Sequence, residues 1–215
     1  NLKDLVGNLY CKEEYIKLTG DEVAFDKKEG TLHLEQNVII TTSTGAKLTT
    51  DSLDWDRKKE TVSTKDLVNI ERENMLTIAE GAVGEPSLSR VTLEKDVKVD
   101  INPQQEQNQS KAGNNKTTIT CDGPLQVDYD KNIATFHNNV KVENQDIIIF
   151  SDIMEVYFLP SQDKEKENSQ ENASMTATKI NKIVARGNVK IERGENVSYS
   201  DEAVYSALDK KITLS

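Results

Sequence analysis

Short apolar phrases recur along the chain, and in each of them two aliphatic residues stand two positions apart. Successive side chains of a β-strand point to opposite faces, so residues two apart share one face. The pattern therefore predicts strands that have one aliphatic face. The phrases lie at 37–40, 96–99, 139–142 and 188–191, with a weaker copy at 67–70.

A second phrase lies between copies of the first. It begins with a small or acidic residue, alternates apolar and polar positions, and ends in an aromatic residue. Residues 152–157 match it with one extra position, which requires a β-bulge or turns the following side chains to the other face. The clearest copies are 21–25, 51–55 and 201–205, and 125–129 matches in its apolar part.

The valines of the first phrase show the spacing. Val38 and Val68 are 30 positions apart, and Val68 and Val97 are 29 apart. Val97 and Val140 are 43 apart, but a polar tract of 14 residues at 102–115 lies between them. A second polar tract, which begins at Pro160, lengthens the next interval. The interpretation is a structural repeat of about 30 residues, interrupted by two loops too poor in apolar residues to offset the entropy of ordering.

Residues that favour turns follow both phrases, as at 26–30 and 56–59 after the second and at 43–45 and 194–196 after the first. Each repeat is then two strands and two turns. We expect about a dozen strands in all, and no helix beyond a single turn near residues 2–9.

Stacked repeats of this kind make a sheet with one continuous apolar face. Val38 and Ile40 would point inward and Ile39 outward, and folding the sheet over would set two apolar walls face to face. The walls either pack together as an ordinary sandwich core or stay apart as a trough for alkyl chains. The scarcity of large aromatic residues inside, together with unpaired strands at both ends, favours the trough.

Composition excludes several classes of function. The net charge is −10 with no clustered basic stripe, so nucleic acid is not an expected partner. No stretch approaches the roughly 18 apolar residues of a membrane span. Cys11 and Cys121 have no metal-binding spacing and are expected to be free thiols. Since the chain starts abruptly at Asn1, we expect that a signal or anchor has been removed.

The sequence contains no arrangement of residues that indicates a catalytic site. His33 and His137 are the only histidines, and neither has a nucleophile or metal ligands beside it, so we assign both to surface strands or turns. Asp54 and Asp56 lie at the expected end of a strand, where aspartates start turns more often than they bind calcium. We therefore expect a turn here and no calcium site. We predict no catalytic residue, no metal and no cofactor.

At this point the phrases resemble a known family. Residues 187–191, 199–205 and 210–214 are similar to the OstA-like repeat of lipopolysaccharide-export proteins. Residues 117–215 look most like the LptA family. Residues 16–99 look more like the LptC family, on the segment 45–56 and the glycine-bearing 79–84. The presence of both resemblances in one chain suggests a natural fusion.

The resemblance implies an all-β fold, an open antiparallel β-jellyroll. Its interior would hold the acyl chains of lipopolysaccharide in the periplasm, as part of an export bridge. Its edge strands would pair with neighbouring bridge proteins and with inner-membrane ABC transporter components. Further copies of the chain would associate head to tail in the same way. A helix before Asn1 would anchor it to the inner membrane. The expected parts are 1–101 (LptC-like), 102–116 (loop or linker) and 117–215 (LptA-like). The predicted lipid-binding residues are Leu32, Leu34, Val38, Ile40, Leu53, Trp55, Val68, Ile70, Val97, Val99, Val127, Tyr129, Val140, Val142, Val189 and Ile191.

Two alternatives stay open. One is a structural or adhesive β-repeat protein without lipid cargo, although a parallel solenoid usually has shorter coils than this repeat. The other is a carbohydrate-active enzyme on a β-helix, which would need a constellation of carboxylates that the sequence does not supply.

Overall fold

The computed structural model describes residues 2–11, 14–102, 116–159, 180–209 and 211–215, which form fourteen β-strands and no helix. All the strand pairs are antiparallel and belong to one sheet, so the predicted all-β antiparallel fold is confirmed and agrees with an open β-jellyroll. The strands are β1 (Leu2–Cys11), β2 (Glu14–Asp26), β3 (Thr31–Thr42), β4 (Lys47–Asp56), β5 (Thr61–Arg72), β6 (Met75–Gly84), β7 (Arg90–Ile101), β8 (Thr117–Cys121), β9 (Leu125–Asp128), β10 (Ile133–Asn144), β11 (Ile147–Phe158), β12 (Ile180–Arg193), β13 (Asn196–Ser206) and β14 (Lys211–Leu214).

The helical turn expected near residues 2–9 is wrong. These residues belong to β1, which pairs with β2 from Leu2 opposite Val23 to Cys11 opposite Glu14. Pairing with a neighbouring strand satisfies the backbone groups of this segment, and the local sequence gives no sign of that partner. The two polar tracts lie largely at 103–115 and 160–179, outside the described residues, so the loops expected there stay a prediction.

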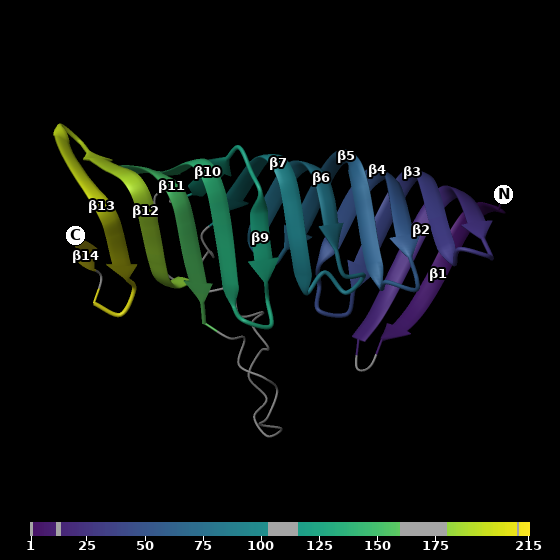
Figure 1. Cartoon of the computed structure of the whole chain (residues 1–215). Coiled ribbons are helices and arrows are strands. Elements are labelled where there is room, and N and C mark those ends of the chain that lie inside the picture. The colour runs from purple at the N-terminus through teal and green to yellow at the C-terminus, as the bar shows by residue number, and fades with distance from the viewer. Residues whose placement is uncertain (1, 12–13, 103–115, 160–179, 210) are drawn as a thin grey trace, which may run out of the picture.

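Strand order follows chain order with one exception. β8 and β9 both lie between β7 and β10, and together they take the place of one long strand. Figure 1 shows the resulting row of strands running from β1 at one end to β13 and β14 at the other, with the sheet doubled over into a front and a back layer.

Most of the long strands bend near the middle, where the pairing register shifts. In β3 the shift falls between Glu35 and Val38, and in β12 between Arg186 and Val189. Such shifts are β-bulges, which bend a strand and increase its twist. We call this row of bends the fold line. It divides the sheet into a first wall, which carries Leu34, Leu53, Leu93 and Met154, and a second wall, which carries Val38, Leu48, Val97 and Val140.

The asparagine of the first sequence phrase lies on the fold line. Asn37, Asn139 and Asn188 have φ angles of 52°, 52° and 47°, in the left-handed region that asparagine tolerates better than most residues. The amide of Asn37 donates to Asp21 at 2.6 Å, and that of Asn188 donates to Asp152 at 2.8 Å. These aspartates belong to the second phrase, so the two phrases meet where the sheet turns.

Gly123 lies where the fold line crosses the gap between β8 and β9. Its φ angle is 102°, and a Cβ atom placed on it would clash with the backbone oxygen of Glu94. The carbonyl of Gly123 also accepts a hydrogen bond of 2.7 Å from the Asn138 amide. Only a residue without a side chain fits this combination of dihedral and contact.

The turns at the strand ends use the aspartates that the sequence indicated. Asp26 Oδ1 accepts hydrogen bonds from the backbone N–H of Lys28 and Glu29, and Asp56 Oδ1 does the same for Lys58 and Lys59. Side-chain bonds of this kind hold the chain in a turn.

Exchanging Gly123 for alanine tests whether the close approach of Gly123 to the Glu94 backbone stabilises the fold line. We expect Gly123→Ala to lower the free energy of unfolding by about 2–4 kcal/mol, because dihedral strain and a backbone clash add. Gly45→Ala is the matched control: its φ is also positive, at 85°, but no atom lies within 4 Å of the added Cβ. Urea unfolding measures both variants, and equal losses of stability would contradict this account of the fold line.

Candidate functional site: the interior of the folded sheet

The space between the two walls is lined by one contiguous cluster of apolar side chains, which reaches from Ile16 on β2 to Ala203 on β13. The valines of the five copies of the first phrase are all at most 1% exposed. Each is the inward residue next to the fold line, as the two-residue alternation predicted. These five valines are Val38, Val68, Val97, Val140 and Val189.

The structure brings the predicted interior residues to this one surface. Leu32, Ile70, Val127 and Tyr129 are half-buried, and the first three of these pack against the core cluster. The fully buried members of the predicted set are Leu34, Val38, Ile40, Leu53, Trp55, Val68, Val97, Val99, Val140, Val142, Val189 and Ile191. Their contact with lipid stays a prediction.

Sequence reasoning missed part of the same surface. Ile16 and Leu18 on β2 and Leu48 on β4 are buried, and their own two-residue alternation could have identified them. Leu88 is also buried, but it lies in the turn between β6 and β7, where no strand pattern applies.

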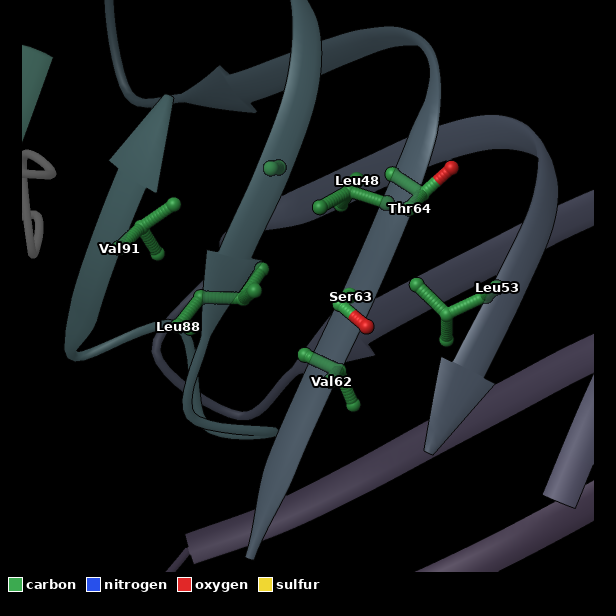
Figure 2. Close-up of a pocket in the computed structure, with 9 residues that line it drawn as sticks. Leu48, Leu53, Val62, Ser63, Thr64, Leu88 and Val91 are labelled. Carbon is green, nitrogen blue, oxygen red and sulfur yellow. The ribbon is translucent and has the colours of Figure 1, made fainter. Parts of the chain in front are cut away.

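The walls lie close together rather than apart. The two leading voids among the described residues have volumes of about 10 and 30 Å³. Voids of this size have room for only a few water molecules. Figure 2 shows side chains around the smaller void, with Leu53, Val62 and Val91 on the first wall and Leu48 on the second.

The side of the molecule opposite the fold line is where the far ends of the walls approach each other. There the Arg72 guanidinium, at the end of β5, lies 3.7 Å from the ring centroid of Tyr129, just after β9. The Tyr129 ring also stacks on Phe158, with 6.5 Å between centroids. Burial raises the pKa of the Tyr129 hydroxyl, and the neighbouring Arg72 charge partly opposes that rise.

Polar groups gather on the outer faces. His33 Nδ1 lies 2.7 Å from Asp54 Oδ1, and His33 Nε2 lies 3.0 Å from Glu35 Oε1, which raises the pKa of the exposed imidazole above its ordinary value of 6.5. Within the described ranges no group of three or more His, Cys, Asp or Glu could hold a metal ion. Cys121 is a free, buried thiol whose pKa is raised by burial.

The interior is continuous across β7, β8 and β9. Leu93 pairs with Leu125 on the first wall, and Val97 pairs with Cys121 on the second. Asp100, near the end of β7, accepts a hydrogen bond of 2.8 Å from Thr118 and lies 3.0 Å from the ammonium of Lys116. The sheet and its apolar core therefore run through this junction without a break.

Two family models match the chain, and they meet close to this junction. Residues 8–102 match "Lipopolysaccharide-assembly, LptC-related", and residues 118–215 match "LptA/(LptD N-terminal domain) LPS transport protein". Each part of the chain thus matches a lipopolysaccharide-transport family, and the two matches together cover most of its length. The chain joins an LptC-related part, which ends after β7, to an LptA-like part, which begins in β8. No curated protein matches the chain.

These two matches support a role in lipopolysaccharide transport across the periplasm. LptC and LptA proteins are periplasmic, non-enzymatic, and act in a transport bridge with other Lpt proteins. In the part of the chain that the structure describes, no helix is long and apolar enough to cross a membrane.

The carboxylate of Asp100 reports on the junction between the two parts. Burial raises its pKa, but hydrogen bonds from Thr118, Lys116 and Lys98 more than offset this and hold the pKa below 3.8. A lowered folded-state pKa contributes stability above the unfolded-state value, and this contribution is lost as the pH falls through the folded-state pKa. We expect a carboxyl NMR titration midpoint below 3.8 for Asp100, and a higher midpoint in Lys116→Met. A midpoint that Lys116→Met leaves unchanged would contradict this coupling.

Proposed function

We propose that the interior of the folded sheet is a trough that holds the acyl chains of lipopolysaccharide during transport. The observation that carries the proposal is the single aliphatic surface that passes without interruption from the LptC-related part into the LptA-like part. An acyl chain needs an unbroken apolar path, because every exposed methylene loses the favourable free energy of burial.

The chemistry of this surface suits a moving cargo. Each buried methylene contributes about 0.8 kcal/mol before ordering costs. The inward side chains that we assign to the lipid, such as Val38, Val97 and Val189, offer no hydrogen bonds that would fix the position of a chain along the row of strands. A lipid held in this way can slide, and transport requires that it does.

Lipid loading must separate the walls, because their side chains pack into one buried cluster and the two voids described within it are far smaller than an acyl chain. The fold line is covalently continuous and bonded by the Asn–Asp pairs, so it acts as the hinge side. The opposite side is joined by side-chain contacts such as Arg72 over Tyr129. We place the lipid entrance on that side, with the sugar headgroup outside in water.

The two ends of the sheet are the surfaces for neighbouring bridge proteins. β14 pairs with β13 only from Ala203 to Ser206, so within the described residues the 196–200 half of β13 has no strand on its outer side. Val197 and Tyr199 on that half are exposed. An unpaired edge of this kind accepts a further strand by β-augmentation, from an ABC transporter component, another bridge protein or a second copy. Anchoring by a helix before Asn1 stays a prediction.

The small voids also favour a second candidate, a structural β-repeat protein with a solid core and no lipid cargo. The two hypotheses differ in one measurable contact, which is that between the inward valines and an acyl chain.

Site-specific photocrosslinking tests the trough. We expect a photoreactive amino acid at Val140 or Val189 to label lipopolysaccharide, because both side chains are buried between the walls. The matched controls are Lys141 and Lys190, the next residues along the same strands, whose side chains form ion pairs on the outer face. Labelling at the valines alone supports the proposal. Absence of labelling at all four positions in folded protein favours the structural candidate.

Self-association tests the end surfaces. Because strand pairing at an edge is a bimolecular contact, we expect the sedimentation coefficient to rise with protein concentration. Tyr199→Pro, on the unpaired half of β13, should shift this rise to higher concentration, since proline removes a backbone donor and disfavours pairing. A wild-type protein that stays monomeric over a wide range of concentration would argue against head-to-tail association.

A further inference from the structure

The turn between β6 and β7 carries a leucine into the interior. Leu88 lies between Gly84, the last residue of β6, and Arg90, the first of β7. Turn residues ordinarily face solvent, yet Leu88 is only 1% exposed and belongs to the core cluster. It reaches the core from outside the strands, unlike the buried leucines of the walls.

The backbone of Leu88 is strained. Its φ angle is 58°, in the left-handed region that glycine and asparagine adopt readily and bulky residues adopt rarely. A strained conformation persists only where its surroundings enforce it, and such positions cluster at ligand sites and switch regions. Here the enforcing contact is the burial of the side chain between the walls.

Leu88 occupies the space that separates the two voids. Leu88 and Val91 line both voids, whereas Leu48 lines only the smaller and Ala46 only the larger. Figure 2 shows the Leu88 side chain extending from the turn toward the strands that carry Leu48 and Val62. Removing a buried leucine side chain leaves a cavity on the order of 150 Å³ that accepts an apolar molecule. Without Leu88 the two voids would therefore merge into one apolar space.

Most bonds of this turn join its own residues to one another or to Arg90, as do those from Glu85 N–H to the Arg90 carbonyl at 3.0 Å and from Ser89 N–H to Ser87 Oγ at 3.3 Å. Leu88 N–H donates to the Glu85 carbonyl at 2.9 Å, and Arg90 pairs with the Glu85 carboxylate at 3.0 Å. The Ser89 carbonyl accepts a bond of 2.9 Å from the Tyr129 N–H, at the side where the lipid entrance is proposed. The turn could therefore leave the interior without breaking a strand pair.

We propose that Leu88 is an internal plug, an aliphatic side chain that fills the trough of the LptC-related part and that an acyl chain displaces. This inference rests on the proposed function. In the empty protein Leu88 keeps the apolar walls covered. When lipid arrives, acyl carbons take over the same contacts, the turn moves outward, and the left-handed strain at Leu88 is released.

Hydrogen exchange on the wild-type protein tests displacement directly. On loading with purified lipopolysaccharide, the amides of Leu88 and Tyr129 should exchange faster, because the bond from Tyr129 to Ser89 opens and the bond from Leu88 to Glu85 is lost as the turn rearranges. The amides of β5 and β10 should stay protected. Lipid binding that leaves the turn as protected as in the empty protein overturns the plug.

Leu88→Gly tests occupancy, since glycine accepts the φ angle and removes the side chain. In the wild-type protein the Leu88 side chain must leave before lipid can bind. Removing this side chain should therefore raise the affinity for lipopolysaccharide roughly tenfold or more. The fluorescence of Trp55, the only tryptophan, reports binding from within the core. Leu48→Ala is the matched control: it empties the same void from a strand, leaves the plug in place and should not give this gain.

The outcomes separate the two hypotheses. Tighter binding by Leu88→Gly together with faster exchange in the turn supports the plug. If lipid binds but Leu88→Gly does not bind it more tightly and the turn does not exchange faster, the plug is overturned and the trough hypothesis is unaffected. Failure of both wild type and Leu88→Gly to bind lipopolysaccharide overturns the trough, and the plug with it.

Discussion

The backbone of this protein has to turn through the middle of its strands while keeping its sheet hydrogen bonds. The fold line solves this with β-bulges, left-handed residues and cross-strand bonds from asparagine to aspartate, as between Asn37 and Asp21. Without these bends the sheet would stay open, and its aliphatic face would lie in water. Each asparagine that bonds to an aspartate on the fold line is followed directly by a buried valine, as Asn37 is by Val38. The same short phrase therefore places both the bend of the strand and an inward side chain.

The doubled sheet has one side that is continuous along the backbone and, within the described residues, an opposite side that is joined by side-chain contacts such as that of Arg72 with Tyr129. This asymmetry gives the interior a direction in which it can open. The same walls continue through β7, β8 and β9, so the LptC-related and LptA-like parts share one apolar path. In separate proteins such a path would depend on association between chains. Here the chain itself provides it.

Much of the fold and part of the site could be predicted from local pattern. The alternation around Val38, Val140 and Val189 identified inward residues correctly, because side-chain direction in a strand follows from position alone. Ile16 and Leu48 were missed although the same rule applies to them. Leu88 and the contact of Arg72 with Tyr129 could not have been found in this way, since both join segments far apart in the chain.

Local sequence pattern was enough to establish that the chain is all-β, which residues share a face, and which lipopolysaccharide-export families it resembles. These properties depend on neighbours along the chain and on recurring phrases. The three-dimensional arrangement was needed to establish that β1 is a strand, that the Asn and Asp of different phrases bond at the fold line, and that the interior is closed around Leu88. Those features depend on which segments meet in space, and the pairing of distant strands is a property of the whole sheet.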